Sequence, residues 1–269
     1  VGGLRKDVDM NRIDLTLFDR VKRVFPSDRH ELRRAAINFQ SIKREYWDWK
    51  SELDLPKKYP SSEIDLCYLA VNTACQHFES SLDFAQGLEY LLSEKRANII
   101  PAICILLRQS FESAITAHWI CAESDIRNLA QRGYQVAVRD LNNKYNLAEQ
   151  LYNFEPMHYN YKNLNVEKIA EEKLKLLLIG NKLDFSSKLA KEIYAPLITR
   201  LFKNANICGE KMNLTWAYMM LSAVGHGTWL GFYPSDKEFT YLINLKDLTL
   251  REGLNRLKAR SAKLIELTG

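Results

Sequence analysis

Helical periodicity is the feature that most constrains the fold of this chain. Apolar residues recur at intervals of three and four over most of the sequence, which is the spacing of one face of an α-helix. In residues 11–25 this face carries Ile13, Leu17, Val21 and Val24. The whole chain has only 7 prolines and 11 glycines, too few for a turn-rich β fold. The pattern therefore predicts an all-α protein, an irregular bundle of about eight or nine helices.

Capping signals place the ends of several helices. Ser62 and Asp65 have the spacing of a capping box before a long helix over residues 63–93. Asn165 is a candidate N-cap for the helix that follows it, and Gly180 is the residue type that commonly ends a helix. The other predicted helices cover residues 11–25, about 30–50, 98–123, about 125–152, 166–180, about 187–205, about 213–225 and about 246–267.

Residues 229–243 depart from this pattern. The segment "WLGFYPSDKEFTYLI" has two aromatic, β-favouring stretches on either side of a Pro-Ser-Asp-Lys turn. We therefore expect one short β-hairpin near residues 229–243.

A linker divides the chain unequally. Residues 52–63, "ELDLPKKYPSSE", contain two prolines and a serine pair and lack helical spacing. We expect residues 1–52 to form an N-terminal helical arm and residues 62–269 to form the main helical bundle, a single compact unit.

Composition limits the compartment and the partners. The net charge of +5 permits an anionic partner without requiring one. The five cysteines include no Cys-x-x-Cys pair, so we expect reduced, buried thiols. The first residues lack the apolar segment of a secretory signal, and the longest apolar run, near residues 98–107, is too short to span a bilayer. We expect a cytoplasmic protein with no membrane partner.

A charged pair interrupts one of the most apolar helices. Arg108 and Glu112 lie four residues apart in "LLRQSFESAITAHW", where they can pair on one helical face. A buried ion pair needs further hydrogen-bond partners to offset its desolvation. The segment "YMMLSAVGHGTW" offers such partners, because Tyr218, Ser222 and His226 share a helix face and glycines flank the histidine.

This five-residue cluster has two interpretations. As a catalytic site, His226 would transfer protons and Arg108 would bind an anion such as a phosphate. As a structural network, the same groups would satisfy one another inside a helical core. In either case we expect Arg108 and His226 to lie within about 10 Å of each other.

The two segments resemble motifs of known proteins. "LLRQSFE" and "LSAVGHG" look like the Arg-x-x-x-Glu helix and the late Ser-x-x-x-His of uncharacterised bacterial all-helical proteins. More distantly, residues 95–230 resemble the HEPN superfamily, many members of which are RNases in toxin–antitoxin and phage-defence systems. The resemblance implies a protein that acts on or binds RNA or a nucleotide in bacterial defence.

The catalytic motif of HEPN RNases is not intact here. Those enzymes carry an arginine, four to six residues and then a histidine on one helix. Arg23 and His30 fit that spacing, but Pro26 lies between them and breaks helical geometry. A HEPN relative with this sequence would be degenerate or would use Arg108 and His226 for a ribonuclease-like activity. The alternative is a non-catalytic helical interaction protein whose polar core is structural.

Other enzyme classes lack their motifs. A di-iron bundle needs two Glu-x-x-His motifs, and the chain has one, at Glu155 and His158, in a proline-interrupted loop. There is no Walker A, GxGxxG, GxSxG or HExxH pattern. We expect no metal and no cofactor, and a helical-bundle metalloenzyme is the third interpretation.

The first fifty residues are a candidate nucleic-acid surface. They hold 12 Lys and Arg against 8 Asp and Glu, interleaved with aromatic residues. Basic side chains contact phosphates and exposed aromatic rings stack on bases. The candidate contacts are Arg29, Arg33, Arg34, Lys43 and Arg44. The alternative is a solvated helix whose aromatic residues face the core. The partners under consideration are thus RNA or a nucleotide, a protein partner, or a second copy in a homodimer.

Overall fold

The computed structural model describes residues 29–55, 62–93, 100–123, 125–154, 165–187, 221 and 236–268. These residues form six α-helices and no strand, which confirms the all-α class for this part of the chain. The helices are α2 (Arg29–Glu52), α3 (Glu63–Ser93), α4 (Ile100–Cys121), α5 (Ile126–Phe154), α6 (Val166–Lys182) and α9 (Asp236–Thr268). The helices predicted at 11–25, 187–205 and 213–225 lie outside the described residues apart from residue 221, so the count of eight or nine is not confirmed.

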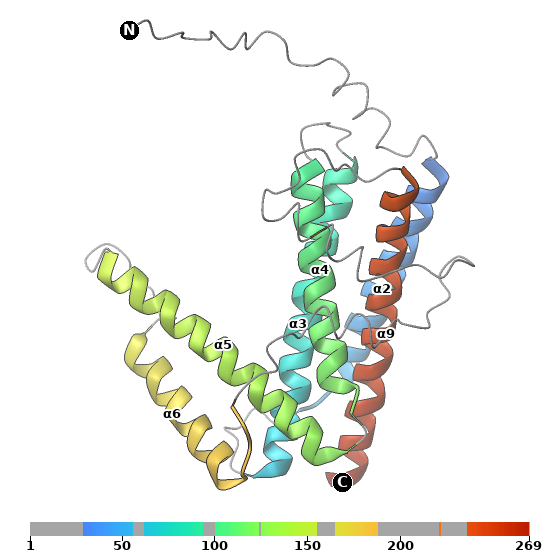
Figure 1. Ribbon diagram of the computed structural model, residues 1–269. Coiled ribbons are helices and arrows are strands. Elements are labelled where there is room, and N and C mark those ends of the chain that lie inside the picture. The colour runs from blue at the N-terminus through green and yellow to red at the C-terminus, as the bar shows by residue number, and fades with distance from the viewer. Residues whose placement is uncertain are drawn as a thin grey trace, which may run out of the picture.

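Four of the helices form the main bundle. α2, α3, α4 and α9 lie side by side, and α3 runs opposite to the other three (Figure 1). α5 crosses the lower part of α3 and then extends away from the bundle, and α6 packs back along α5 (Figure 1). α2 packs on both α9 and α3, so a surface groove that lies between α2 and α9 belongs to the bundle. The division into an arm over 1–52 and a main bundle over 62–269 stays a prediction.

α3 packs against α2, α4, α5 and α9. Tyr46 of α2 and Phe78 of α3 are fully buried, with ring centroids 4.9 Å apart. Between α3 and α4, Ser81 Oγ donates to the Ser110 carbonyl at 2.6 Å and Ser110 Oγ donates to the Ser81 carbonyl at 3.0 Å. This exchange satisfies two buried hydroxyl groups, so the two helices approach closely without leaving a polar group unpaired.

Two of the predicted caps are confirmed. The Ser62 amide donates to Asp65 Oδ2 at 3.1 Å, and the Asp65 amide donates to Ser62 Oγ at 3.2 Å, which is a reciprocal capping box at the start of α3. Asn165 Oδ1 accepts from the Lys168 amide at 2.9 Å at the start of α6. Each cap satisfies amide groups that the first helical turn leaves without a partner.

The predicted role of Gly180 as a C-cap is wrong. α6 continues to Lys182, and the residue with a left-handed backbone is Asp184, with φ of 56°. Gly180 is buried inside the helix, where a Cβ would overlap the ring of Tyr134 on α5. Glycine is therefore required at this position for close packing between α5 and α6, and not for a change of backbone direction.

The predicted hairpin is wrong over residues 236–243, because α9 begins at Asp236 and runs unbroken for 33 residues. Tyr241, Leu242 and Ile243 are all buried, so neighbouring helices cover several sides of this stretch. A helix covered on several sides loses its amphipathic spacing, and a short apolar run then resembles a strand. Residues 229–235 of the predicted hairpin lie outside the described part of the chain.

Candidate functional site

Arg108 and Glu112 form the predicted ion pair on α4. Arg108 Nε lies 2.8 Å from Glu112 Oε1, and both side chains are largely buried. The Glu112 carbonyl also accepts from Thr116 Oγ1 at 2.9 Å. Tyr218, Ser222 and His226 lie outside the described residues, so their predicted contact with this pair stays a prediction.

The predicted nucleic-acid contacts all lie on α2. Lys43 Nζ donates to Gln86 Oε1 of α3 at 3.0 Å, and Arg44 lines the groove between α2 and α9. Arg29, Arg33 and Arg34 lie in the first two turns of α2, and their side chains lie outside the described part of the structure. Binding of nucleic acid by these residues stays a prediction.

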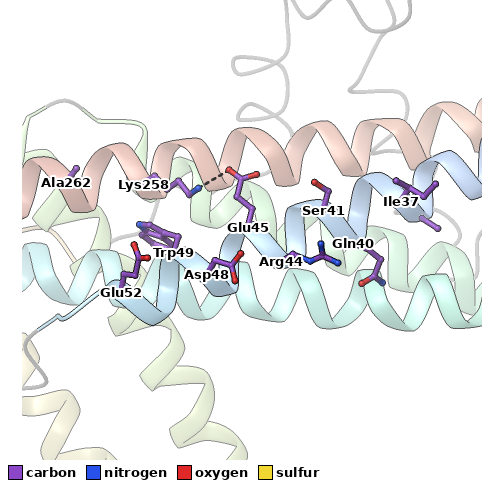
Figure 2. Close-up of a pocket in the computed structure, with 11 residues that line it drawn as sticks. Ile37, Gln40, Ser41, Arg44, Glu45, Asp48, Trp49, Glu52, Lys258 and Ala262 are labelled. Carbon is purple, nitrogen blue, oxygen red and sulfur yellow. Dashed lines mark hydrogen bonds and ion pairs between the residues drawn. The ribbon is translucent and has the colours of Figure 1, made fainter.

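A groove of about 1010 Å³ lies between α2 and α9. Figure 2 shows the side chains that line it, contributed by successive turns of α2 and by α9. They are Ala36, Ile37, Gln40, Ser41, Arg44, Glu45, Asp48, Trp49, Glu52, Lys258 and Ala262. The lining from residue 36 to residue 52 spans about 24 Å at 1.5 Å per residue, the length of a helix of about sixteen residues.

A carboxylate joins the two walls of this groove. Glu45 Oε1 accepts from Lys258 Nζ at 2.8 Å, and Glu45 Oε2 accepts from Arg251. The hydrogen bond from Lys258 is the main cause that lowers the pKa of Glu45, and Arg251 adds to it. Glu45 is therefore held as a carboxylate that ties α2 to α9 (Figure 2).

The remaining charges of the groove are available to a ligand. Arg44, Asp48 and Glu52 have no ion-pair partner among the described residues. They lie on an apolar background, because Trp49 is half-buried and Ile37 is 62% exposed. The groove therefore combines a strongly exposed apolar side chain with three charges that lack an ion-pair partner among the described residues.

A second charged cluster lies inside the bundle. Lys246 Nζ, which is completely buried, lies 3.3 Å from Glu89 Oε1 and 3.2 Å from Asp247 Oδ1. The ammonium group also lies 4.9 Å from the centroid of the Phe39 ring. Two carboxylates thus share one buried ammonium group, and we refer to Lys246, Glu89 and Asp247 as the interior cluster.

The interior cluster is not fully satisfied. Asp247 lies within ion-pair distance of Lys246, but neither of its oxygens accepts a hydrogen bond. Burial raises the pKa of the Asp247 carboxyl to about 6, although Lys246 acts in the opposite direction. A buried carboxylate without hydrogen bonds is destabilising, so at neutral pH this residue costs folding free energy.

A histidine is paired with a carboxylate where α3 meets α5. His77 Nε2 lies 3.2 Å from Asp140 Oδ2, and Arg139 Nη2 lies 3.0 Å from Asp140 Oδ1. His77 lowers the pKa of Asp140 by hydrogen bonding, against the effect of burial, and Arg139 lowers it further. An imidazole oriented by a carboxylate beside a guanidinium is chemically able to act as a general base near a phosphate.

The described cysteines are confirmed as buried thiols. Cys67, Cys75, Cys104 and Cys121 are free, and burial raises the pKa of each one. Cys208 lies outside the described residues. High thiol pKa values leave little thiolate, so these side chains pack and do not react.

The described residues contain no group of three or more His, Cys, Asp or Glu arranged to hold a metal ion. Glu155 and His158 lie outside the described part of the chain. Among the described helices, none combines the length and the apolar character that a membrane-spanning segment needs.

The comparisons with known proteins leave the resemblance untested. No protein-family model, no curated protein and no solved structure matches this chain. The HEPN-like interpretation, with its implied role in defence, therefore stays a prediction.

Sequence reasoning missed the interior cluster and the His77–Asp140 pair. In both cases the partners are far apart in the chain, 157 residues for Lys246 and Glu89 and 63 residues for His77 and Asp140. A local signal existed for the first, because Lys246 and Asp247 interrupt the apolar stretch "YLINLKDLTL" as Arg108 interrupts its own helix. The sequence around His77 on α3 contains no comparable signal, because nothing in it indicates a partner as distant as Asp140.

Proposed function

We propose that this protein is a non-catalytic helical interaction protein that binds an amphipathic helix of a protein partner in the groove between α2 and α9. The observation that carries the proposal is the combination of an exposed apolar lining with unpaired charges in an elongated groove of about 1010 Å³. Helix-in-groove recognition uses apolar anchors at helical spacing, with charges at the rim fixing orientation.

The charges of the groove favour a peptide over a nucleic acid. Three carboxylates, Glu45, Asp48 and Glu52, and two cations, Arg44 and Lys258, line it. A polyphosphate would meet repulsion at Asp48 and Glu52, which have no neutralising partner in the described structure. A partner helix with a basic flank would instead gain two ion pairs at that end of the groove.

The experiment titrates the protein with a defined probe. An 18-residue synthetic helix with leucines on one face and lysines on the other is labelled and followed by fluorescence anisotropy. A second helix carries glutamates in place of the lysines, and a 12-nucleotide single-stranded RNA is the third probe. We expect binding of the lysine helix, at least about tenfold weaker binding of the glutamate helix, and no competition by the RNA.

Two matched pairs of variants locate the binding. Ala262 lines the groove and Ala259 is exposed on the same helix outside it. Ala262→Trp should fill the groove and abolish binding, whereas Ala259→Trp should leave it unchanged. Likewise Asp48→Lys should weaken binding of the lysine helix more than Asp54→Lys does. Equal affinities across each pair would refute the proposal.

A second candidate function rests on the His77–Asp140 pair. We propose it as the site of a ribonuclease-like activity if the protein is a HEPN relative, because the pair and Arg139 supply a base and a cation close together. The test is cleavage of a single-stranded RNA by the full chain. His77→Asn should abolish cleavage that Arg108→Lys leaves intact, and a chain without cleavage activity removes this candidate.

A further inference from the structure

The charges of α2 change sign along the helix. Residues 29–40 contain three arginines and one glutamate, whereas residues 45–54 contain four carboxylates and one lysine. Arg44, near the middle of the groove lining, separates the two ends. The sequence of α2 is therefore basic in its first half and acidic in its second half.

We propose that a second copy of this chain occupies the groove, with the two α2 helices antiparallel about a two-fold axis near Arg44. This inference rests on the proposed function, since it names the helix that the groove receives. In an isologous dimer each patch meets itself in reverse. Antiparallel pairing brings the basic end of each helix onto the acidic end of the other, whereas parallel pairing would oppose like charges.

The apolar residues of the groove fit the same arrangement. Ile37, which is 62% exposed, lies toward one end of the lining and Trp49 lies toward the other. Reversing one helix about an axis near residue 44 places Ile37 of each copy close to Trp49 of the other. The dimer thereby buries the apolar lining of the groove, including an isoleucine that a monomer leaves in water.

The axis also gives Arg44 a partner. Because it lies near the axis, Arg44 of each copy faces Arg44 of the other and lies about 6 Å along the helix from Asp48 of the other copy. The two Asp48 carboxylates then offset the repulsion between the two guanidinium groups. Neither Arg44 nor Asp48 has an ion-pair partner among the described residues of its own chain. The dimer would contain this pair twice, at the centre of the interface, where charge complementarity fixes register.

The competing occupant is the predicted helix over residues 11–25 of the same chain. Its basic stretch "RVKR" at 20–23 directly precedes the arginines at the start of α2. Folding that helix back onto α2 would place like charges together. Charge complementarity therefore favours the second copy over the chain's own first residues.

The experiment measures mass in solution and then exchanges charges. Sedimentation equilibrium of the full chain should give a dimer that dissociates on dilution. Arg44→Glu and Asp48→Arg should each raise the dimer dissociation constant by about tenfold or more. The double variant with both changes should restore the dimer, because each new glutamate meets a new arginine on the other copy. Lys144→Glu, on exposed α5, is the control that should leave association unchanged.

The outcomes separate this inference from the proposed function. Circular dichroism melts check that each variant is folded. A monomeric full chain, or a double variant no better than the single ones, overturns the dimer. If that monomer still binds the lysine helix and Ala262→Trp abolishes the binding, the groove function stands while the dimer fails. If a chain lacking residues 1–28 gains peptide binding that the full chain lacks, the first residues fill the groove and the dimer is likewise refuted.

Discussion

Two charged clusters join α9 to its neighbours by the same design and differ in burial. In the interior cluster one cation, Lys246, is shared by two carboxylates, and its side chain is fully buried. In the rim cluster one carboxylate, Glu45, is shared by Arg251 and Lys258, and all three side chains are about one-third exposed. Both clusters carry one unbalanced charge. At the rim, water solvates and screens that charge. In the interior, the charge is desolvated, which costs folding free energy.

The buried charges serve the packing of the bundle, whereas the exposed charges of the rim remain in contact with solvent. At the rim, an unbalanced charge costs little free energy, and the proposed partner would contact Arg44 and Asp48 beside it. In the interior, each charge constrains its neighbours and no partner can reach it.

Lys246→Met should be the most damaging change. It keeps the length of the side chain but leaves Glu89 and Asp247 without a counter-ion in the bundle, and removing one member of a buried pair costs about 3–5 kcal/mol. The measurement is the free energy of unfolding from urea denaturation at neutral pH. Lys258→Met at the rim is the matched control, with an expected loss below about 1 kcal/mol. Equal losses for the two lysines would show that burial does not separate the clusters.

His118 should make the bundle sensitive to acid. Burial, together with Arg256 and Arg132, lowers the pKa of His118 from 6.5 to about 4. The unfolded chain therefore binds a proton that the folded chain does not, and stability falls as pH drops from 6.5 toward 4. The difference corresponds to a loss of about 3 kcal/mol across that range. His118→Gln cannot titrate, so its free energy of unfolding should fall less over the same interval. A wild-type chain and variant with parallel pH profiles would contradict this assignment.

A structural feature can be predicted from the sequence when the residues that determine it lie close together along the chain. The capping box at Ser62 and the cap at Asn165 are decided within four residues, and both were predictable. The Arg108–Glu112 pair is likewise local, and its geometry follows from helical spacing.

The predictions that are wrong concern features that depend on packing between segments far apart in the sequence. Gly180 looked like a helix end because nothing in the sequence shows that Tyr134 lies against it. The start of α9 looked like a strand because its apolar residues are covered on several sides. The groove depends on which faces of α2 and α9 approach each other, and periodicity identifies a buried face without naming its partner.

Asp247→Asn should stabilise the protein at neutral pH. Burial raises the pKa of Asp247 from 3.8 to about 6, so the folded chain holds a proton between these values that the unfolded chain releases. The contribution of Asp247 to the free energy of unfolding is therefore fully present below pH 3.8 and is lost as the pH rises through 6. The amide removes that loss, and we expect a gain of about 1–3 kcal/mol at neutral pH, less than the full shift implies because Lys246 loses one partner. The gain should vanish at pH 4, where the wild-type carboxyl is already mostly protonated. A variant that is destabilised at neutral pH would show that Asp247 is a net favourable partner of Lys246.

Glu45→Gln should have the smallest effect and the clearest dependence on salt. Exposed ion pairs contribute about 0.2–1 kcal/mol, and the amide keeps the size of the side chain while removing its charge. Salt at about 1 M shortens the screening length to about 3 Å, so the difference between wild type and variant should nearly disappear there. The interior cluster is sheltered from ions, and the loss caused by Lys246→Met should persist at the same salt concentration. Thermal melts of both variants at low and high salt decide the matter. If salt abolished both effects, the interior cluster would have to be open to solvent. If salt abolished neither effect, Glu45 would hold α2 against α9 by packing and not by charge.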